Sequence, residues 1–401
     1  MQEQRHIPFS PPDITQVEID AVAEVLRSGW ITTGPRTKEL EHILCSFTGA
    51  AGMACLSSAT AALECALRIC GIGPGDEVIV PAYTYSASAS VVVHVGATPV
   101  LVDVAPGSFF PSAETYAAAL TPRTKAVIPV DIAGVMADYD AIFDALDGYE
   151  GWQPANSVQE CFARPIVIAD AAHSLGAVRG GRPSGSVADF TAFSFHAVKN
   201  FTTAEGGALA WRDFGFDTDE LYRQAMLWSL HGQTKDALHK EAGSWEYDIE
   251  FPGYKWNMTD LQAALGVVQL GRYPQLLARR KELVECYERN LAEAPVQVLK
   301  HYGEGFSSSG HLMLVRVEGA NEVQRNAIIA RMADAGIACN VHYKPLPMLS
   351  AYKKLGYDIA HFPHAFAQYE NEVSLPLHTL LTNDDVDYIC EQFMAAIKEC
   401  V

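Results

Sequence analysis

The segment PIVIADAAHSLGA, residues 165–177, carries an apolar run that stops at an aspartate. So short a run could belong to a strand or to a buried helix, but it is one of a series that recurs at regular intervals between glycines and prolines, which favours strands. The other members of the series are EVIVPAY (77–83), TPVLVDV (98–104), KAVIPVDI (125–132), DFTAFSF (189–195) and GALAW (207–211). The sequence therefore predicts a sheet built from short buried strands.

Helical patterns such as TAALECALRIC (60–70) separate these strands. Strands that alternate with helices predict a parallel sheet covered by helices on both faces. After about Gly271 the pattern changes to a long charged helix over residues 272–294 and then to a shorter mixture of strands and helices. We therefore expect an α/β fold, with a mostly parallel sheet in a large α/β/α domain (residues 1–271) and a smaller C-terminal α/β domain (residues 272–401).

The composition is that of an ordered globular protein with an excess of negative charge. Of 401 residues, 49% are hydrophobic and 19% charged, and 29 lysines and arginines face 48 acidic residues, for a net charge of −19. This excess argues against a nucleic-acid partner. The nine cysteines are scattered without a CxxC pair, and no apolar run is long enough to span a bilayer. We expect a cytoplasmic protein with reduced cysteines, no metal and no membrane association.

Two polar segments lie where a parallel sheet binds its ligands. Asp170 ends its strand at the carboxyl edge of the sheet, where α/β proteins place ligands, although a helix cap is the alternative. LSSATAALECAL (56–67) puts hydroxyls and free backbone N–H groups at the start of a helix, an arrangement that binds phosphate. An ordinary N-cap accounts for the same residues.

Lys199 lies in FSFHAVKNFTTAEGG (193–207), between a strand that closes at Ser194 and a glycine turn. Its amine would stand at the same sheet edge as Asp170, where loss of water makes an amine a weaker base and a better nucleophile. The alternative is a structural lysine in a salt bridge, because an unpaired buried charge is costly.

Taken together, these parts suit pyridoxal 5′-phosphate. This cofactor needs a lysine that bonds to its aldehyde, a carboxylate that holds its pyridine nitrogen protonated, and a phosphate site at a helix N-terminus. It also needs an aromatic face against its ring, which PAYTYSASAS (81–90) supplies with Tyr83 and Tyr85. Either tyrosine alone could be an ordinary core or surface residue.

With these motifs in place, the chain resembles the DegT family of sugar-nucleotide aminotransferases nearly from end to end. The segments that carry the resemblance, in the family's order and spacing, are SGWITTGP (28–35), SSATA (57–61), GDEVIVPAYTY (75–85), DAAHSLGA (170–177), FSFHAVKN (193–200), AEGG (204–207), GYKWNMTDLQAALG (253–266), VHY (341–343) and SLPLH (374–378). Within the family they are most similar to the members that make UDP-4-amino-4-deoxy-L-arabinose. The resemblance implies the type I fold of PLP-dependent aminotransferases and a homodimer.

The resemblance also implies roles for matching positions. Lys199 falls on the lysine that bonds to the cofactor, Asp170 on the partner of the pyridine nitrogen, and His173 on the Gln or His that contacts the ring's phenolic oxygen. The positions that match the phosphate site and the stacking aromatic are Ala59, Thr60, Ser194 and Tyr85.

One match concerns the second subunit. Asn257 falls on the asparagine that the arabinose members send from the other subunit towards the phosphate, which would make the dimer part of the active site. Many relatives carry that asparagine two positions earlier, where this chain has Lys255. Two further departures, Tyr85 in place of tryptophan and VHYKPLP at residues 341–347, leave the sugar specificity open.

The reaction that the resemblance implies is transamination of a nucleotide-linked 4-keto sugar to a 4-amino sugar, for cell-surface polysaccharide or lipopolysaccharide. Glutamate is the implied amino donor and leaves as 2-oxoglutarate. Candidates for the entrance that holds the sugar nucleotide are Trp30, Thr32, His342 and Tyr343, each of which could instead be a packing residue. The alternatives on this fold are a dehydratase, whose relatives carry histidine at the Lys199 position, and a regulator that has lost a catalytic residue.

Overall fold

The large part of the chain is organised around a seven-stranded sheet, with strands in the spatial order β1-β9-β8-β5-β4-β2-β3. The computed structural model describes residues 5–234 and 246–401. In chain order the strands are β1 (Gly52–Leu56), β2 (Glu77–Pro81), β3 (Thr98–Val102), β4 (Thr124–Val127), β5 (Ile166–Asp170), β8 (Phe190–Ser194) and β9 (Gly207–Trp211). Among these strands β9 runs antiparallel to its neighbours β1 and β8, while the other six share one direction. The mostly parallel sheet is therefore confirmed, and the apolar runs predicted as strands form all of it except β1.

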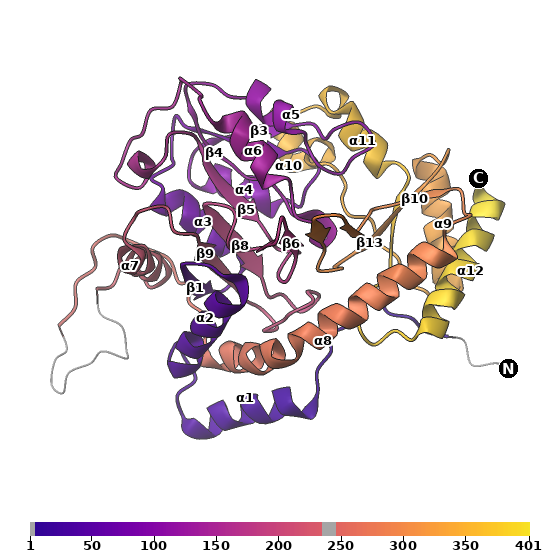
Figure 1. Ribbon diagram of the computed structural model, residues 1–401, viewed down its shortest axis with the longest axis horizontal. Coiled ribbons are helices and arrows are strands. Elements are labelled where there is room, and N and C mark those ends of the chain that lie inside the picture. The colour runs from indigo at the N-terminus through magenta and orange to yellow at the C-terminus, as the bar shows by residue number, and fades with distance from the viewer. Residues whose placement is uncertain (1–4, 235–245) are drawn as a thin grey trace.

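Helices cover both faces of this sheet (Figure 1). One face carries α3 (Ala59–Ile69), α4 (Ala87–His94) and α7 (Thr218–Ser229). The other carries α2 (Pro35–Thr48), α5 (Ala113–Ala118), α6 (Tyr139–Leu146) and the first half of α8 (Asp260–Asn290). Successive residues of a strand point to opposite faces, so Val78 and Val80 enter the first core and Ile79 the second. Burial on both faces is what makes each strand a continuous apolar run in the sequence.

The C-terminal part forms a smaller α/β layer around its own core. Its antiparallel sheet has the order β10-β13-β14, with β10 (Val296–Val298), β13 (Met313–Val317) and β14 (Glu372–Leu375). The helices α9 (Glu322–Asp334) and α12 (Asn383–Cys400) pack on this core, whereas the buried residues of α10 (Ser350–Lys354) and α11 (Pro363–Tyr369) join the first core of the large sheet. A small sheet joins the two parts through β6 (Val178–Arg179), β7 (Arg182–Pro183), β11 (Tyr302–Gly303) and β12 (Phe306–Ser307).

Helix α8 is shared by the two parts. It begins at Asp260, earlier than the charged pattern at residue 272 predicts, because Thr259 and Gln262 form a capping box. Tyr273 belongs to the core under the large sheet, whereas Tyr287 belongs to the C-terminal core. The predicted division between residues 271 and 272 falls inside this helix and stays a prediction.

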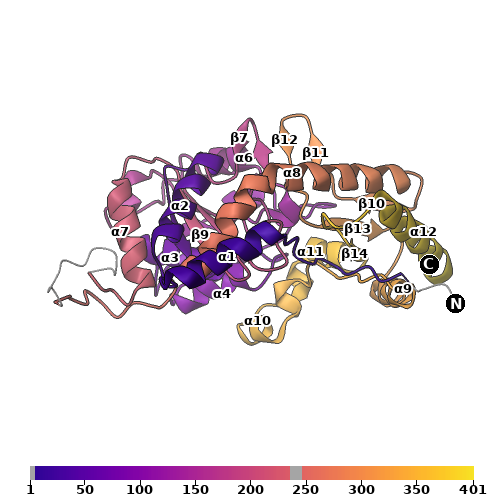
Figure 2. The same ribbon diagram turned by 90° about the horizontal axis from the view of Figure 1, so that it is seen from below.

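Helix α1 (Gln16–Ser28) lies along α8 in both views (Figure 1, Figure 2). The guanidinium of Arg272 in α8 binds Asp13 at 2.8 Å and the buried Glu18 of α1 at 2.6 Å. No helix in the described ranges combines the length and the apolar character needed to cross a membrane.

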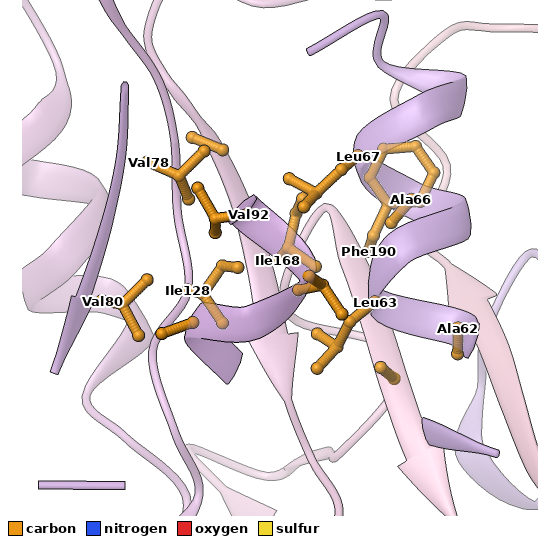
Figure 3. Close-up of a cluster of buried hydrophobic side chains, with 14 of the residues drawn as sticks. Ala62, Leu63, Ala66, Leu67, Val78, Val80, Val92, Ile128, Ile168 and Phe190 are labelled. Carbon is orange, nitrogen blue, oxygen red and sulfur yellow. The ribbon is translucent and has the colours of Figure 1, made fainter. Parts of the chain in front are cut away.

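We expect Leu63→Ala to destabilise the protein strongly. Leu63 is fully buried between α3 and the sheet (Figure 3). Removing its branched end would leave a cavity and lower the free energy of unfolding by about 3 kcal/mol. The matched control is Val323→Ala on α9, because Val323 is 78% exposed and should change stability by less than about 0.5 kcal/mol. Urea unfolding followed by circular dichroism measures both, and equal stability of the two variants would contradict the role assigned to this core.

Candidate active site

A cavity of about 350 Å³ opens at the carboxyl edge of the large sheet. The segments that follow β1, β2, β5 and β8 all reach it, because parallel strands bring their carboxyl ends to one edge. The predicted site residues that line it are Ala59, Thr60, Tyr85, Asp170, His173, Ser194, Lys199, His342 and Tyr343. Residues that are far apart in the sequence therefore lie together at this edge of the sheet.

Lys199 and Asp170 share this cavity and act on each other's charge. Burial lowers the pKa of the Lys199 amine from 10.5 to about 8, and the negative charge of Asp170 opposes that shift. Burial likewise raises the pKa of the Asp170 carboxyl, against the effect of its hydrogen bonds and of Lys199. The site thus holds an amine that is readily deprotonated near neutral pH beside a buried acid.

Asp170 is held by a residue that the sequence analysis did not single out. Ser88 of α4 donates its hydroxyl to Asp170 Oδ2 at 2.6 Å, and the N–H of Ala172 donates to Oδ1 at 3.3 Å. Thr84 lies within hydrogen-bond distance of Ser88, at 2.8 Å between the two hydroxyl oxygens. These donors favour the charged form of the carboxylate. The only sign of these hydrogen bonds in the sequence is the four-residue spacing between Thr84 and Ser88 in PAYTYSASAS.

His173 is held in one tautomer. The N–H of Ala133 donates to its Nδ1 at 3.2 Å, so the ring proton must lie on Nε2, which is 3.1 Å from the Tyr343 hydroxyl oxygen. Burial lowers the pKa of His173 well below its usual value. A neutral ring therefore presents a single N–H at the wall of the cavity.

The start of α3 forms the other end of the cavity. Ser58 caps this helix by accepting the N–H of Ala61 at 3.0 Å, which leaves the first N–H groups of the helix, around Ala59 and Thr60, available to an anion. Gly207 packs directly on this turn, since a Cβ there would lie 2.3 Å from the carbonyl carbon of Ser58. Gly207, the second glycine of AEGG, is thus needed to bring β9 against the start of α3.

Three predicted residues lie outside this cavity: Trp30, Thr32 and Asn257 do not line it. They gather instead near the starts of α2 and α8. Asn257 donates to the Thr33 hydroxyl at 2.6 Å, the Trp30 indole N–H donates to the Thr33 carbonyl at 3.1 Å, and the N–H of Asp260 donates to the Thr32 carbonyl at 3.1 Å. The structure therefore brings together nine of the predicted residues in the cavity and leaves these three outside it, although Asn257 forms a β-bridge with Leu56 at the end of β1.

Residues 12–394 match the DegT/DnrJ/EryC1/StrS aminotransferase family. The chain belongs to this family. It is similar to the spore coat polysaccharide biosynthesis protein SpsC of Bacillus subtilis (strain 168), with 37% identity over 99% of each chain.

Solved structures extend the comparison. Spr1654 of Streptococcus pneumoniae, assigned as a sugar aminotransferase, aligns in its PMP form with a TM-score of 0.97 and 53% identity over 99% of this chain and 100% of that one. PseC of Helicobacter pylori, an aminotransferase of pseudoaminic acid biosynthesis, aligns with a TM-score of 0.85 and 26% identity over 98% of this chain and 100% of that one. These likenesses confirm the type I fold and a PLP-dependent aminotransferase.

The cofactor of this aminotransferase is pyridoxal 5′-phosphate, and Spr1654 is also known in a PLP form that aligns with a TM-score of 0.96 and 51% identity over 99% of this chain and 100% of that one. The cavity fits this group on its own terms. It offers a lysine amine, a buried carboxylate and an open helix start. A side chain at Gly207 would press on the backbone of Ser58 and Ala59, so the glycine keeps the start of α3 undistorted.

We expect the Lys199 amine to titrate near about pH 8 in the cofactor-free protein. Pulsed acylation at a series of pH values, read by mass spectrometry of the Lys199 peptide, measures this. Asp170→Asn should move the midpoint to lower pH, because the carboxylate charge raises the amine's pKa. The exposed Lys354, labelled in the same sample, should not respond to that substitution. An unchanged or higher Lys199 midpoint in Asp170→Asn would contradict the electrostatic coupling of the pair.

Proposed function

We propose that this aminotransferase moves an amino group from glutamate to the 4-keto group of a nucleotide-linked sugar, in the synthesis of a cell-surface polysaccharide. The observation that carries the proposal is the meeting of Lys199 and Asp170 in one cavity beside an open helix start. The description of SpsC as a polysaccharide biosynthesis protein and of Spr1654 as a sugar aminotransferase supports the choice of substrate class. A dehydratase on this fold is disfavoured because a lysine, not a histidine, occupies position 199.

Lys199 has two tasks in this proposal. When bound, the cofactor supplies an electron sink for the carbon next to the transferred nitrogen. The Lys199 amine holds the cofactor between turnovers and, once released, takes the proton from the α-carbon of the amino donor. A pKa of about 8 suits this base, because a useful fraction of the amine is then neutral at physiological pH.

Asp170, His173 and Tyr85 position the ring. The carboxylate of Asp170, kept charged by Ser88 and the N–H of Ala172, pairs with the protonated pyridine nitrogen. His173 donates its Nε2–H to the phenolic oxygen from the tautomer that Ala133 fixes. Tyr85, which lines the cavity and is 63% exposed, covers a face of the ring.

The phosphate and the sugar nucleotide take the two ends of the cavity. The N–H groups at the start of α3 and the hydroxyls of Thr60 and Ser194 hold the phosphate. His342 and Tyr343, which also line the cavity, contact the sugar.

A second copy of the chain completes the site in this proposal. Apolar side chains remain exposed in two places, at the cavity and in the cluster near the starts of α2 and α8, which is unusual for a surface that faces only water. These side chains and their exposed fractions are Trp30 (37%), Ile31 (48%), Tyr85 (63%) and Val198 (40%). A homodimer that covers them would bring Asn257, Trp30 and Thr32 of one copy to the cavity of the other, which accounts for a cluster that lies outside its own cavity.

Lys199→Ala should abolish the visible absorbance of lysine-bound cofactor and lower amino transfer by about 10³-fold or more, because both the attachment point and the base are lost. Absorbance spectroscopy and single-turnover assays with glutamate measure the two effects. Lys354→Ala is the matched control on the surface and should change neither. Wild-type turnover in Lys199→Ala would remove the mechanism.

A panel of nucleotide-linked keto sugars should identify the acceptor. We expect amination of one among UDP-4-keto-pentose, UDP-4-keto-6-deoxy-N-acetylhexosamine, and the dTDP- and GDP-4-keto-6-deoxyhexoses, with glutamate consumed in equal amount. Mass spectrometry of the sugar product and an enzymatic assay of 2-oxoglutarate give the readout. Amination of a free keto sugar or keto acid, with no nucleotide-linked sugar accepted, would refute the nucleotide linkage.

A further inference from the structure

His342 borders the cavity, and two residues of β14 that the proposed mechanism does not use hold its ring. Glu372 is fully buried and accepts the backbone N–H of His342 with Oε2 at 2.9 Å. Its Oε1 lies 2.6 Å from the Ser374 hydroxyl, and that hydroxyl lies 2.8 Å from His342 Nδ1. A continuous chain of hydrogen bonds therefore runs from a buried carboxyl to a ring at the cavity wall.

The direction in which these hydrogen bonds donate depends on whether Glu372 carries a proton. An ionised Glu372 can only accept, so the Ser374 hydrogen points to Oε1 and Nδ1 of His342 must be the donor. A protonated Glu372 carries its hydrogen on Oε1, because Oε2 is occupied by the His342 N–H. It then donates to Ser374, whose hydrogen turns to Nδ1. Since a neutral imidazole has one N–H, Nε2 is an acceptor in the first state and a donor in the second.

Both states are within reach near physiological pH. Burial raises the pKa of Glu372 to about 8, against the hydrogen bonds from Ser374 and His342 and the charge of Arg325. Burial and the charge of Lys199 lower the pKa of His342 to about 4, so the ring stays neutral in both states. The titratable and charged groups around Glu372 are Tyr83, Arg325, Cys339, His342 and Tyr343. Burial raises the pKa of the two tyrosines and of the cysteine, which leaves Arg325 as the constant charge.

We propose that Glu372 and Ser374 are positioning residues that set which ring nitrogen of His342 carries the proton, and therefore whether His342 offers the substrate a donor or an acceptor. Because Nδ1 of His342 is bonded to Ser374, Nε2 is the ring nitrogen that remains available to a ligand in the cavity. Control of the tautomer does not depend on the substrate, whereas its use in amino transfer rests on the proposed function.

The change of tautomer at His342 would serve amino transfer for a chemical reason. A keto oxygen can only accept a hydrogen bond, whereas the protonated amine that replaces it can only donate, so a group that reverses its polarity can bind both. The change between the two states delivers one proton. Nε2–H gives its proton to the hydroxyl oxygen formed from the ketone, which leaves as water when its bond to carbon breaks. Ser374 gives its own proton to Nδ1, and Glu372 gives its own to Ser374 and takes one from solvent before the next turnover. Glu372 ends ionised, Nδ1 ends protonated, and the imidazole never carries a positive charge.

The test is the tautomer of His342 in the holoenzyme labelled with ¹⁵N-histidine. Two-bond ¹H–¹⁵N correlation spectra distinguish the two tautomers by the nitrogen that bears the proton, and loss of a signal in His342→Gln assigns the ring among the 13 histidines. From about pH 6 to about pH 10 we expect the wild type to change from Nε2–H to Nδ1–H. One tautomer over the whole range would overturn the proposal.

Two variants test the chain itself. Glu372→Gln keeps the shape and donates its amide hydrogen to Ser374, so it should lock the Nε2–H form at every pH and lower kcat about tenfold or more with little change in KM. Ser374→Ala should abolish the pH dependence of the tautomer. Glu41→Gln is the matched control, because Glu41 is another buried carboxyl and accepts the Cys55 N–H and the Tyr222 hydroxyl instead. The proposed hydrogen-bond chain would be refuted if the tautomer of His342 still changed with pH in Glu372→Gln. It would also be refuted if Glu41→Gln abolished that change. No substrate is present in these spectra, so failure of the proposed acceptor leaves their outcome unaffected.

Discussion

The structure depends on keeping an amine and a carboxylate together at the dry edge of a sheet. Burial acts on the two groups in the same sense, lowering the pKa of Lys199 and raising that of Asp170, so that each is pushed towards its neutral form. Their mutual attraction and the hydroxyl of Ser88 resist that push. The balance leaves a reactive amine beside an acid that can still be charged, which is the condition that a PLP enzyme requires.

The antiparallel strand β9 couples the two ends of the site. The turn that carries Lys199 leaves β8 at Ser194 and returns at Gly207, and these two residues pair across the strands. The Phe195 N–H also donates to Gly206 at 2.9 Å, so the turn is closed at its base. Because Gly207 also packs against Ser58, a shift of the lysine turn would move the start of α3. The glycine therefore sets the separation between the Lys199 turn and the start of α3, where a residue with a side chain has no room.

The sequence predicted those parts of the site whose positions follow from local sequence patterns, such as apolar strands and their ends. Strand ends located Asp170 and Lys199, because buried parallel strands are apolar runs and their carboxyl ends meet at one edge. It did not reveal β1, whose GMACL lacks β-branched residues, nor Ser88, which meets Asp170 across 82 residues of chain. The roles of Trp30, Thr32 and Asn257 stay predictions, because these residues lie outside the cavity of their own chain and Asn257 was predicted to act in the other subunit. Tertiary partners decide such contacts, and no local pattern records them.

Two neutral histidines at the cavity wall show how the choice of partner determines chemistry. His173 receives a backbone N–H at Nδ1, and because an amide can only donate, its ring is restricted to one tautomer. His342 meets a serine hydroxyl at the same atom, and because a hydroxyl can donate or accept, its ring is free to take either. In the proposed function, the first arrangement suits a cofactor atom whose polarity is constant, and the second suits a substrate position that changes from ketone to amine. The site therefore combines a fixed donor for the group that stays with an adjustable one for the group that reacts.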